Sequence, residues 1–193
     1  NDKILATSVG AKDIIKNTKV YENLEPAIQR VDCLIATTSR FRNKNIKHIK
    51  LDDLNKIDFR KKIAFLFGSE ASGLSNNEIS YANYTMQIPT NPEFKSLNLS
   101  HSVIVIAQIV STLIKLNSPK YKKSNKIKSA SKKDIQSMLN LCVKNLEKRN
   151  FFKPKEKKPI MLENLRSIFY KMELSQKETR ILSSVFANLS KKG

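Results

Sequence analysis

Cysteine is scarce in this sequence, which has two, Cys33 and Cys142, among 193 residues. Cys33 lies in an apolar run, and Cys142 falls on the apolar side of a predicted helix. We therefore expect two buried thiols rather than a disulfide, which suits a cytoplasmic protein. Two cysteines and two histidines without ligand spacing also argue against a structural zinc site.

Long hydrophobic runs are missing as well. The apolar run at residues 103–107 is far shorter than the ~20 residues that a membrane-spanning helix needs. The start of the sequence, residues 1–4, has no apolar core of a secretory signal. The sequence therefore predicts neither a membrane segment nor a metal site, and we expect a cytoplasmic location.

Acidic residues are in short supply. The 17 Asp and Glu face 36 Lys and Arg, so the formal net charge is +19 and the isoelectric point is near 10.0. A polyanionic partner, most commonly a nucleic acid, explains such a balance, and so does the Lys-rich and Asn-rich composition that an A/T-biased genome produces. Seven of the basic residues are Arg. A surface dominated by Lys favours phosphate contacts over base reading, because bidentate base contacts prefer Arg.

The hydrophobic pattern predicts strands that alternate with helices. Apolar runs at residues 31–37 and 63–67 are typical of buried strands, and the alternation of Tyr84, Met86 and Ile88 predicts a third strand that ends at Pro89. Residues 43–50 are interpreted as a basic connector, and residues 99–116 have the apolar spacing of a long helix. An alternating pattern of this kind indicates an α/β fold with a mainly parallel sheet.

Two polar loops come directly after predicted strands. Residues 68–73 follow one strand, and residues 90–95 follow the next. Ligands of open α/β sheets bind at the carboxyl ends of the strands, and Gly68 would allow close approach of the backbone. Residues 67–73 could instead be a phosphate-binding loop of a nucleotide hydrolase, although no Gly-Lys-Ser/Thr follows.

The composition changes after the long predicted helix. Residues 115–133 contain eight lysines and no acidic residue, which predicts a flexible linker. This linker is either a solvated tether or an electrostatic arm for RNA phosphates, and the two roles are compatible. Beyond it, Ser131 with Asp134 and Ser175 with Glu178 are capping boxes that start amphipathic helices. Earlier in the chain, Ser75 with Glu78 forms the same motif before a short helix.

Two stretches of the chain carry a resemblance to a known family. Residues 67–74 read FGSEASGL, and residues 88–99 read IPTNPEFKSLNL. They resemble the second and third signature motifs of the SpoU/TrmH branch of the SPOUT RNA 2′-O-methyltransferases. Within this branch the TrmJ-type tRNA methyltransferases are the most similar, since their C-terminal extension carries a pattern like LRxxF and ILxxxxAxL at residues 165–189.

The resemblance implies a trefoil-knotted α/β fold that binds S-adenosyl-L-methionine, usually as a homodimer. It divides the chain into a methyltransferase domain at residues 1–117, a Lys-rich linker at residues 118–130 and an all-α extension at residues 131–193. The implied reaction is methyl transfer to the 2′-hydroxyl of a tRNA ribose, at cytidine or uridine 32 of the anticodon loop. The alternative is a non-catalytic basic RNA-binding protein that kept the fold.

The motifs also imply site residues. Glu70 would orient its loop and its partners, and Asn98 would shape the cofactor and ribose pocket. The simpler alternatives are a turn acid for Glu70 and a helix-start residue for Asn98. The residues implied to bind the cofactor are Thr37, Thr38, Ser39, Gly68, Ile88, Lys95, Ser96 and Leu97. Arg40 and Arg42 follow the first of these loops and would hold an RNA phosphate, unless they are solvated surface charges.

The first motif of the family has no counterpart among the residues given. That motif, Asn-x-Gly-x-x-x-Arg, follows the first strand of the family fold and would precede Asn1. The resemblance assigns its Arg to positioning of the 2′-hydroxyl. We therefore expect this chain, as written, to lack that strand and that Arg.

Overall fold

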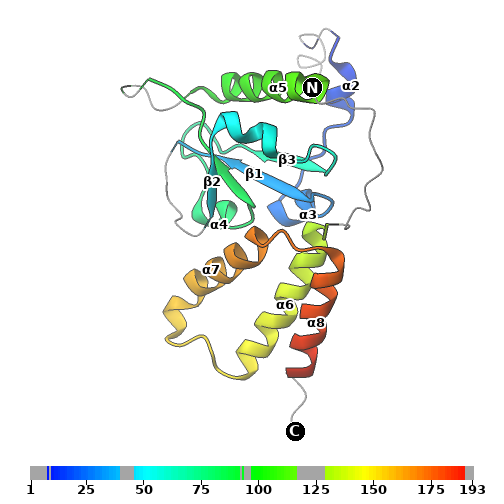
Figure 1. Cartoon of the computed structure of the whole chain (residues 1–193). Coiled ribbons are helices and arrows are strands. Elements are labelled where there is room, and N and C mark those ends of the chain that lie inside the picture. The colour runs from blue at the N-terminus through cyan, green and yellow to red at the C-terminus, as the bar shows by residue number, and fades with distance from the viewer. Residues whose placement is uncertain are drawn as a thin grey trace.

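The computed structural model describes residues 8, 10–39, 46–91, 93, 97–116 and 129–189 (Figure 1). Its centre is a parallel sheet in the order β2-β4-β1-β3. The four strands are β1 (Cys33–Thr37), β2 (Lys47–Ile49), β3 (Ile63–Leu66) and β4 (Tyr84–Met86). The α/β class and the mainly parallel sheet are confirmed, whereas the trefoil knot stays a prediction.

Helices surround this sheet. Those before residues 117–128 are α2 (Lys12–Lys16), α3 (Leu24–Ile28), the 3₁₀ helix η1 (Leu51–Lys56), α4 (Asn76–Ile79) and α5 (Leu99–Leu116). Those after these residues are α6 (Lys132–Lys148), the 3₁₀ helix η2 (Lys155–Lys157), α7 (Lys158–Lys171) and α8 (Gln176–Leu189). The predicted capping boxes are confirmed, since Ser75 and Ser131 accept from the backbone N–H groups three residues later and Ser175 does the same for Glu178.

Strand β1 lies inside the sheet and shows why both faces are covered. Successive side chains of a strand point to opposite faces. Cys33 and Ile35 pack with Ile106 of α5, whereas Leu34 and Ala36 belong to the core cluster that includes residues of α6 and α7. Figure 1 accordingly shows α5 on one side of the sheet and α6, α7 and α8 on the other.

The C-terminal helices α6, α7 and α8 therefore supply one layer of the core. Ile135 and Met138 of α6 and Tyr170 of α7 share a buried cluster with the sheet. Residues 117–128 of the predicted linker lie outside the described residues, and its last two residues are packed: Ser129 forms a bridge with Ser175, and Ala130 is buried. Cys33 and Cys142 are both buried, free thiols, as predicted.

Two sequence-based boundaries were wrong. Part of the expected connector at residues 43–50 is β2, a short strand whose sequence Lys-His-Ile has no alternating apolar pattern. It pairs with β4 alone, so one edge of it lacks a strand partner among the described residues, and charged residues are common on such edges. Strand β4 ends at Met86 rather than at Pro89, because the chain turns there into a loop. No described helix is long and apolar enough to cross a membrane.

One lysine lies in the core of the molecule. Lys132 is 1% exposed, and burial lowers its pKa from 10.5 to about 7. Between these values the unfolded chain holds a proton that the folded chain has lost, so stability rises with pH. Cys33 acts in the opposite direction only above pH 9, because burial raises its pKa from 9.0 to about 11.

We therefore expect the free energy of unfolding to rise between pH 7 and pH 9, with a slope that approaches about 1.4 kcal/mol per pH unit. Urea unfolding at several pH values would measure this slope. Lys132→Met should remove the rise, whereas Lys133→Met, at the exposed neighbouring position, should keep it. An equal slope in all three proteins would contradict the assignment to Lys132.

Candidate functional site

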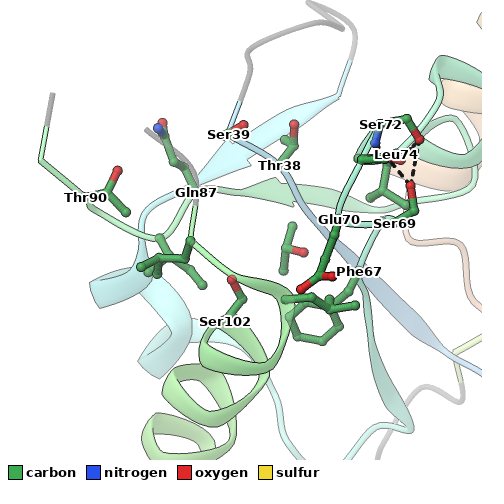
Figure 2. Close-up of a pocket in the computed structure, with 17 residues that line it drawn as sticks. Thr38, Ser39, Phe67, Ser69, Glu70, Ser72, Leu74, Gln87, Thr90 and Ser102 are labelled. Carbon is green, nitrogen blue, oxygen red and sulfur yellow. Dashed lines mark hydrogen bonds between the residues drawn. The ribbon is translucent and has the colours of Figure 1, made fainter. Parts of the chain in front are cut away.

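A pocket opens at the carboxyl ends of β1, β3 and β4, where three loops meet the start of α5 (Figure 2). This is the edge at which open α/β sheets bind ligands. The first loop follows β1, the second follows β3, and the third follows β4. The residues that line the pocket are Thr37, Thr38, Ser39, Phe67, Gly68, Ser69, Glu70, Ala71, Ser72, Gly73, Leu74, Gln87, Ile88, Thr90, Leu97, Leu99 and Ser102.

The structure brings most of the predicted site residues together. Those that line the pocket are Thr37, Thr38, Ser39, Gly68, Glu70, Ile88 and Leu97. Asn98 contacts Glu70 directly. Lys95, Ser96, Arg40 and Arg42 lie outside the described residues. The role of each residue in binding or catalysis stays a prediction.

The first loop is joined to its neighbours on both sides. The Thr37 hydroxyl donates to the carbonyl of Leu66 at 2.9 Å, which links β1 to the end of β3. The Thr38 N–H donates to the carbonyl of Met86 at 2.9 Å, which links β1 to the end of β4. Because the Thr37 hydroxyl is engaged in this bond, the loop is held in one position beside the pocket.

The second loop folds back on Gly68. A Cβ at Gly68 would lie 2.2 Å from the backbone carbon of Gly73 and 2.4 Å from the nitrogen of Leu74. The Gly73 N–H donates to the carbonyl of Ser69 at 2.9 Å, and the hydroxyls of Ser69 and Ser72 are 2.7 Å apart. The sequence predicted that Gly68 allows close approach of a ligand. In the structure, the backbone of its own loop already occupies that space.

Glu70 and Asn98 join the second loop to α5. The Asn98 amide donates to Glu70 Oε1 at 2.8 Å, and Asn98 Oδ1 accepts from the Ser100 N–H at 2.9 Å. Asn98 thus caps α5 and holds the Glu70 carboxylate at the same time. The start of a helix favours negative charge, which stabilises the Glu70 carboxylate at this position.

The pocket has an unusual charge for so basic a protein. Glu70 is the one charged side chain among the described lining residues. Phosphate binding would call for Lys, Arg or a glycine-rich cradle with a lysine. The described lining residues include none of these cations and so give the hydrolase alternative no support. The apolar side chains of Phe67, Ile88 and Leu97 and several hydroxyls complete the lining.

This donor set fits S-adenosyl-L-methionine. Its sulfonium is a cation that suits the Glu70 carboxylate, and its adenine suits an apolar wall with hydroxyl and backbone groups around it. The described residues contain no group of three or more side chains that could hold a metal ion.

Gln87 and Ser102 line the pocket although both lie outside the two motifs, and Thr90 lies in the motif at residues 88–99 without having been assigned a role. Ser102 lies one helical turn after Asn98, and its hydroxyl donates to the Asn98 carbonyl at 3.1 Å. Helical spacing from Asn98 could have indicated it, because residues four apart share one face of a helix. Gln87 and Thr90 flank Ile88 and Pro89, so their place in the loop after β4 was the available indication.

A family model described as the SpoU rRNA Methylase family matches residues 1–108, more than half of the 193 residues. The chain belongs to the SpoU rRNA Methylase family. The match includes both polar loops and the start of α5, so the pocket lies within the family region. The resemblance of the two motifs to this family is thereby confirmed.

Curated relatives and a solved structure point to one branch of the SpoU rRNA Methylase family. The chain is 28% identical over 191 residues to the tRNA (cytidine-2′-O-)-methyltransferase TrmJ of Methanocaldococcus jannaschii, which covers 96% of this chain and 81% of that protein. It is 38% identical over 109 residues to the protein of the same name from Sulfolobus acidocaldarius, which covers 55% of this chain. That match spans less than half of the Sulfolobus protein, 46% of its length.

The crystal structure of TrmJ from Z. mobilis ZM4 has the same fold. It superposes with a TM-score of 0.81 at 25% identity and covers 94% of this chain and 78% of that one. The superposition therefore extends beyond the SpoU region into the C-terminal helices.

Proposed function

We propose that this chain transfers a methyl group from S-adenosyl-L-methionine to the 2′-hydroxyl of a ribose in tRNA. The observation that supports this most is the pocket where three loops meet at the carboxyl edge of the sheet, with Glu70 as the charged group among its described lining residues. Relatives named as tRNA 2′-O-methyltransferases support the same substrate class. The site we propose on the tRNA is cytidine or uridine 32 of the anticodon loop.

The residues of this chain would have two tasks. Bound S-adenosyl-L-methionine supplies a methyl group on a sulfur that is already a good leaving group. The protein must hold the 2′-oxygen in line with that methyl group and favour loss of the hydroxyl proton. Asn98 holds the carboxylate of Glu70 in place, and Figure 2 shows Glu70 reaching toward the start of α5. The first and third loops form the remaining walls.

Two measurements test this function. Calorimetric titration with S-adenosyl-L-methionine should show saturable binding by the 193-residue chain. Transfer of tritium from the labelled methyl group to a tRNA transcript should then depend on one hydroxyl. A transcript with a 2′-deoxy nucleotide at position 32 should accept no label, and a transcript with 2′-deoxy at a neighbouring position should accept it.

The alternative function predicts a different pattern. A non-catalytic RNA-binding protein would retain tRNA in a salt-dependent manner, because phosphate contacts release counterions. It would show no saturable binding of S-adenosyl-L-methionine although the chain is folded. If both 2′-deoxy transcripts accept the label equally, the chain is a methyltransferase but position 32 is not the nucleotide that it methylates.

Glu70 gives a prediction that separates charge from shape. Glu70→Gln keeps an oxygen for the Asn98 amide but removes the negative charge beside the proposed sulfonium. We expect S-adenosyl-L-methionine to bind about tenfold more weakly, since a charge-assisted contact is worth roughly 1.5–3 kcal/mol. S-adenosylhomocysteine, a neutral thioether, should lose much less affinity. Calorimetry with both ligands measures the difference.

The matched control for this charge is Glu93→Gln. Glu93 lies in the third loop but is not among the described residues that line the pocket. Glu93→Gln should leave the affinities for S-adenosyl-L-methionine and S-adenosylhomocysteine unchanged. Equal losses for the two ligands in Glu70→Gln would mean that Glu70 supports the loop only through its shape.

We also propose that the protein is a homodimer through α5. One face of α5 packs on the sheet through Ile106 and neighbouring residues. The other face also carries apolar side chains, with Ile104 64% and Ile114 50% exposed. Exposed apolar side chains gathered on one helix are typical of a contact with another protein surface. Light scattering should give twice the mass of one 22.0 kDa chain, and a monomer mass would remove this proposal.

A further inference from the structure

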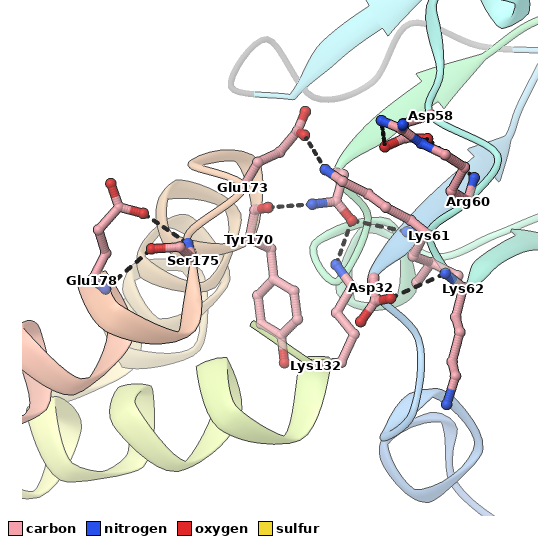
Figure 3. Close-up of polar contacts among 12 residues, drawn as sticks. Asp32, Asp58, Arg60, Lys61, Lys62, Lys132, Tyr170, Glu173, Ser175 and Glu178 are labelled. Carbon is pink, nitrogen blue, oxygen red and sulfur yellow. Dashed lines mark hydrogen bonds and ion pairs between the residues drawn. The ribbon is translucent and has the colours of Figure 1, made fainter. Parts of the chain in front are cut away.

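A polar junction lies inside the core, at the opposite end of the strands from the pocket. It consists of Asn83, which precedes β4, Lys132 at the start of α6, and Tyr170 near the end of α7. Their exposed fractions are 2%, 1% and 1%. Figure 3 shows the Tyr170 ring lying beside Lys132 at the start of α6. Buried polar groups of this kind are costly unless each of them is hydrogen-bonded.

The side chain of Asn83 connects the members of this polar junction. Its Oδ1 accepts from the backbone N–H of Leu34 in β1 at 2.8 Å and from Lys132 Nζ at 2.6 Å. Its amide nitrogen donates to the backbone carbonyl of Tyr170 at 2.6 Å. Lys132 Nζ also donates to the carbonyl of Tyr81 at 3.0 Å and lies 4.3 Å from the centre of the Tyr170 ring.

Lys132 has no carboxylate within ion-pair distance among the described residues, so its contacts are dipoles and a ring. The ionisable groups that act on it are Asp32 and Cys33 at the start of β1, with Tyr170 on the other side. An apolar side chain would fill this position at lower cost in desolvation. The lysine instead gives Asn83 a second donor and ties α6 to the first residues of two strands.

Those two strands lead directly to the pocket. Leu34 lies three residues before Thr37, about 10 Å along β1. Asn83 directly precedes β4, which is followed by the pocket residues Gln87 and Ile88. The strands β1 and β4 pair in register from Ile35 with Tyr84 to Thr37 with Met86. The polar junction holds this pair at its start, and the bond from Thr38 to Met86 holds it at the pocket.

We propose that Lys132 is a positioning residue through which the C-terminal helices set the pocket: by anchoring Asn83, it fixes how β1 and β4 present the first and third loops. No described residue of α6, α7 or α8 lines the pocket, so this effect must pass through the strands. If the strands are in the binding-competent arrangement for only a fraction of the time, the apparent affinity for the ligand falls by that fraction. The part of this inference that concerns S-adenosyl-L-methionine rests on the proposed function.

The test compares three variants of the full chain. Lys132→Met removes the donor at the polar junction. Lys133→Met removes one charge at the exposed neighbouring position. Asn145→Ala removes a buried bond at the far end of the same helix, where the Asn145 amide donates to the Phe186 carbonyl at 2.7 Å. Asn145→Ala therefore loosens the C-terminal helices without touching Asn83.

Hydrogen exchange of two backbone amides is the ligand-free measurement. The Leu34 amide reports on the polar junction, and the Thr38 amide reports on the pocket. In Lys132→Met both amides should exchange about tenfold faster than in the parent chain, because local opening becomes easier. Affinity for S-adenosyl-L-methionine should fall about tenfold, within the usual range of coupling between sites. Lys133→Met and Asn145→Ala should leave the Thr38 amide and the affinity unchanged.

Several results would overturn the inference. Faster exchange at Leu34 without a change at Thr38 would confine the effect to the polar junction. If Asn145→Ala changes the Thr38 exchange and the affinity as much as Lys132→Met does, Lys132 contributes only to the general stability of the C-terminal helices. If Lys132→Met does not fold, Lys132→Gln, which keeps an amide donor, should show smaller changes of the same sign. If the parent chain binds no S-adenosyl-L-methionine, the proposed function fails. The exchange rate of the Thr38 amide in Lys132→Met still shows whether the polar junction is coupled to the pocket.

Discussion

Gly68→Ala should reduce the affinity for S-adenosyl-L-methionine by roughly a hundredfold, the largest single effect that we expect on ligand binding. The added methyl group would lie 2.2 Å from the backbone carbon of Gly73, 2.4 Å from the nitrogen of Leu74 and 2.6 Å from the Cα of Gly73. These are backbone atoms, so a side-chain rotation cannot relieve the contact. The second loop must open, and Glu70 moves with it.

The second glycine of the same loop provides a control for Gly68. Gly73 has a φ of +67°, and no atom lies within 4 Å of the position that its Cβ would take. Gly73→Ala therefore suffers conformational strain alone, about 1–2 kcal/mol. Calorimetry and thermal unfolding of both variants should show a much larger loss of affinity for Gly68→Ala. Similar losses would mean that the loop can open at Gly68 without moving Glu70.

Asn83→Leu should cost about 3–5 kcal/mol of the free energy of unfolding, the largest stability effect that we expect. The substitution leaves the Leu34 N–H and the Tyr170 carbonyl unpaired in the core and takes one acceptor from the buried Lys132. Domains of this size have a total stability of about 5–15 kcal/mol, so the variant would be close to unfolding at moderate temperature. Urea denaturation measures the difference.

A double variant checks the reason for this loss. Asn83→Leu combined with Lys132→Met removes both polar side chains, so no lysine remains buried without its amide partner. We expect the double variant to lose less stability than the two single losses added together, because the residues share one bond of 2.6 Å. Additive losses would show that Asn83 and Lys132 act independently.

Local patterns in the sequence predicted a large part of this structure. Continuous apolar runs located β1 and β3, period-two alternation located β4, and period-3.6 spacing located α5 and the C-terminal helices. Ser-x-x-acid signatures located three helix starts. The strand β2 was missed, because Lys47 to Ile49 has no alternating pattern and becomes a strand only by pairing with β4. Burial on both faces of a parallel sheet leaves a near-continuous apolar run in a central strand and much less of one in an edge strand.

The candidate site divides in the same way. The two motifs contain many of the residues that line the pocket, among them Glu70, and they also contain Asn98, whose amide meets the Glu70 carboxylate at 2.8 Å. The reason for a glycine at position 68 could not be predicted from the sequence. The atoms that exclude a Cβ there belong to the backbone of the same loop, and no local pattern describes the path of that loop. Gln87, Thr90 and Ser102 join the site for a similar reason: the ends of strands and the first turns of α5 converge there.

By itself, the sequence determined the family, the α/β class, the amphipathic helices and the loops that follow strands, because each of these depends on residues close together in the chain. Only the tertiary structure decided that the C-terminal helices cover one face of the sheet, and that Lys132 is a buried partner of Asn83 rather than a linker lysine. Contacts between residues 49 positions apart depend on how the layers pack, and the local pattern of charge at Lys132 and Lys133 is the same for a buried and an exposed side chain.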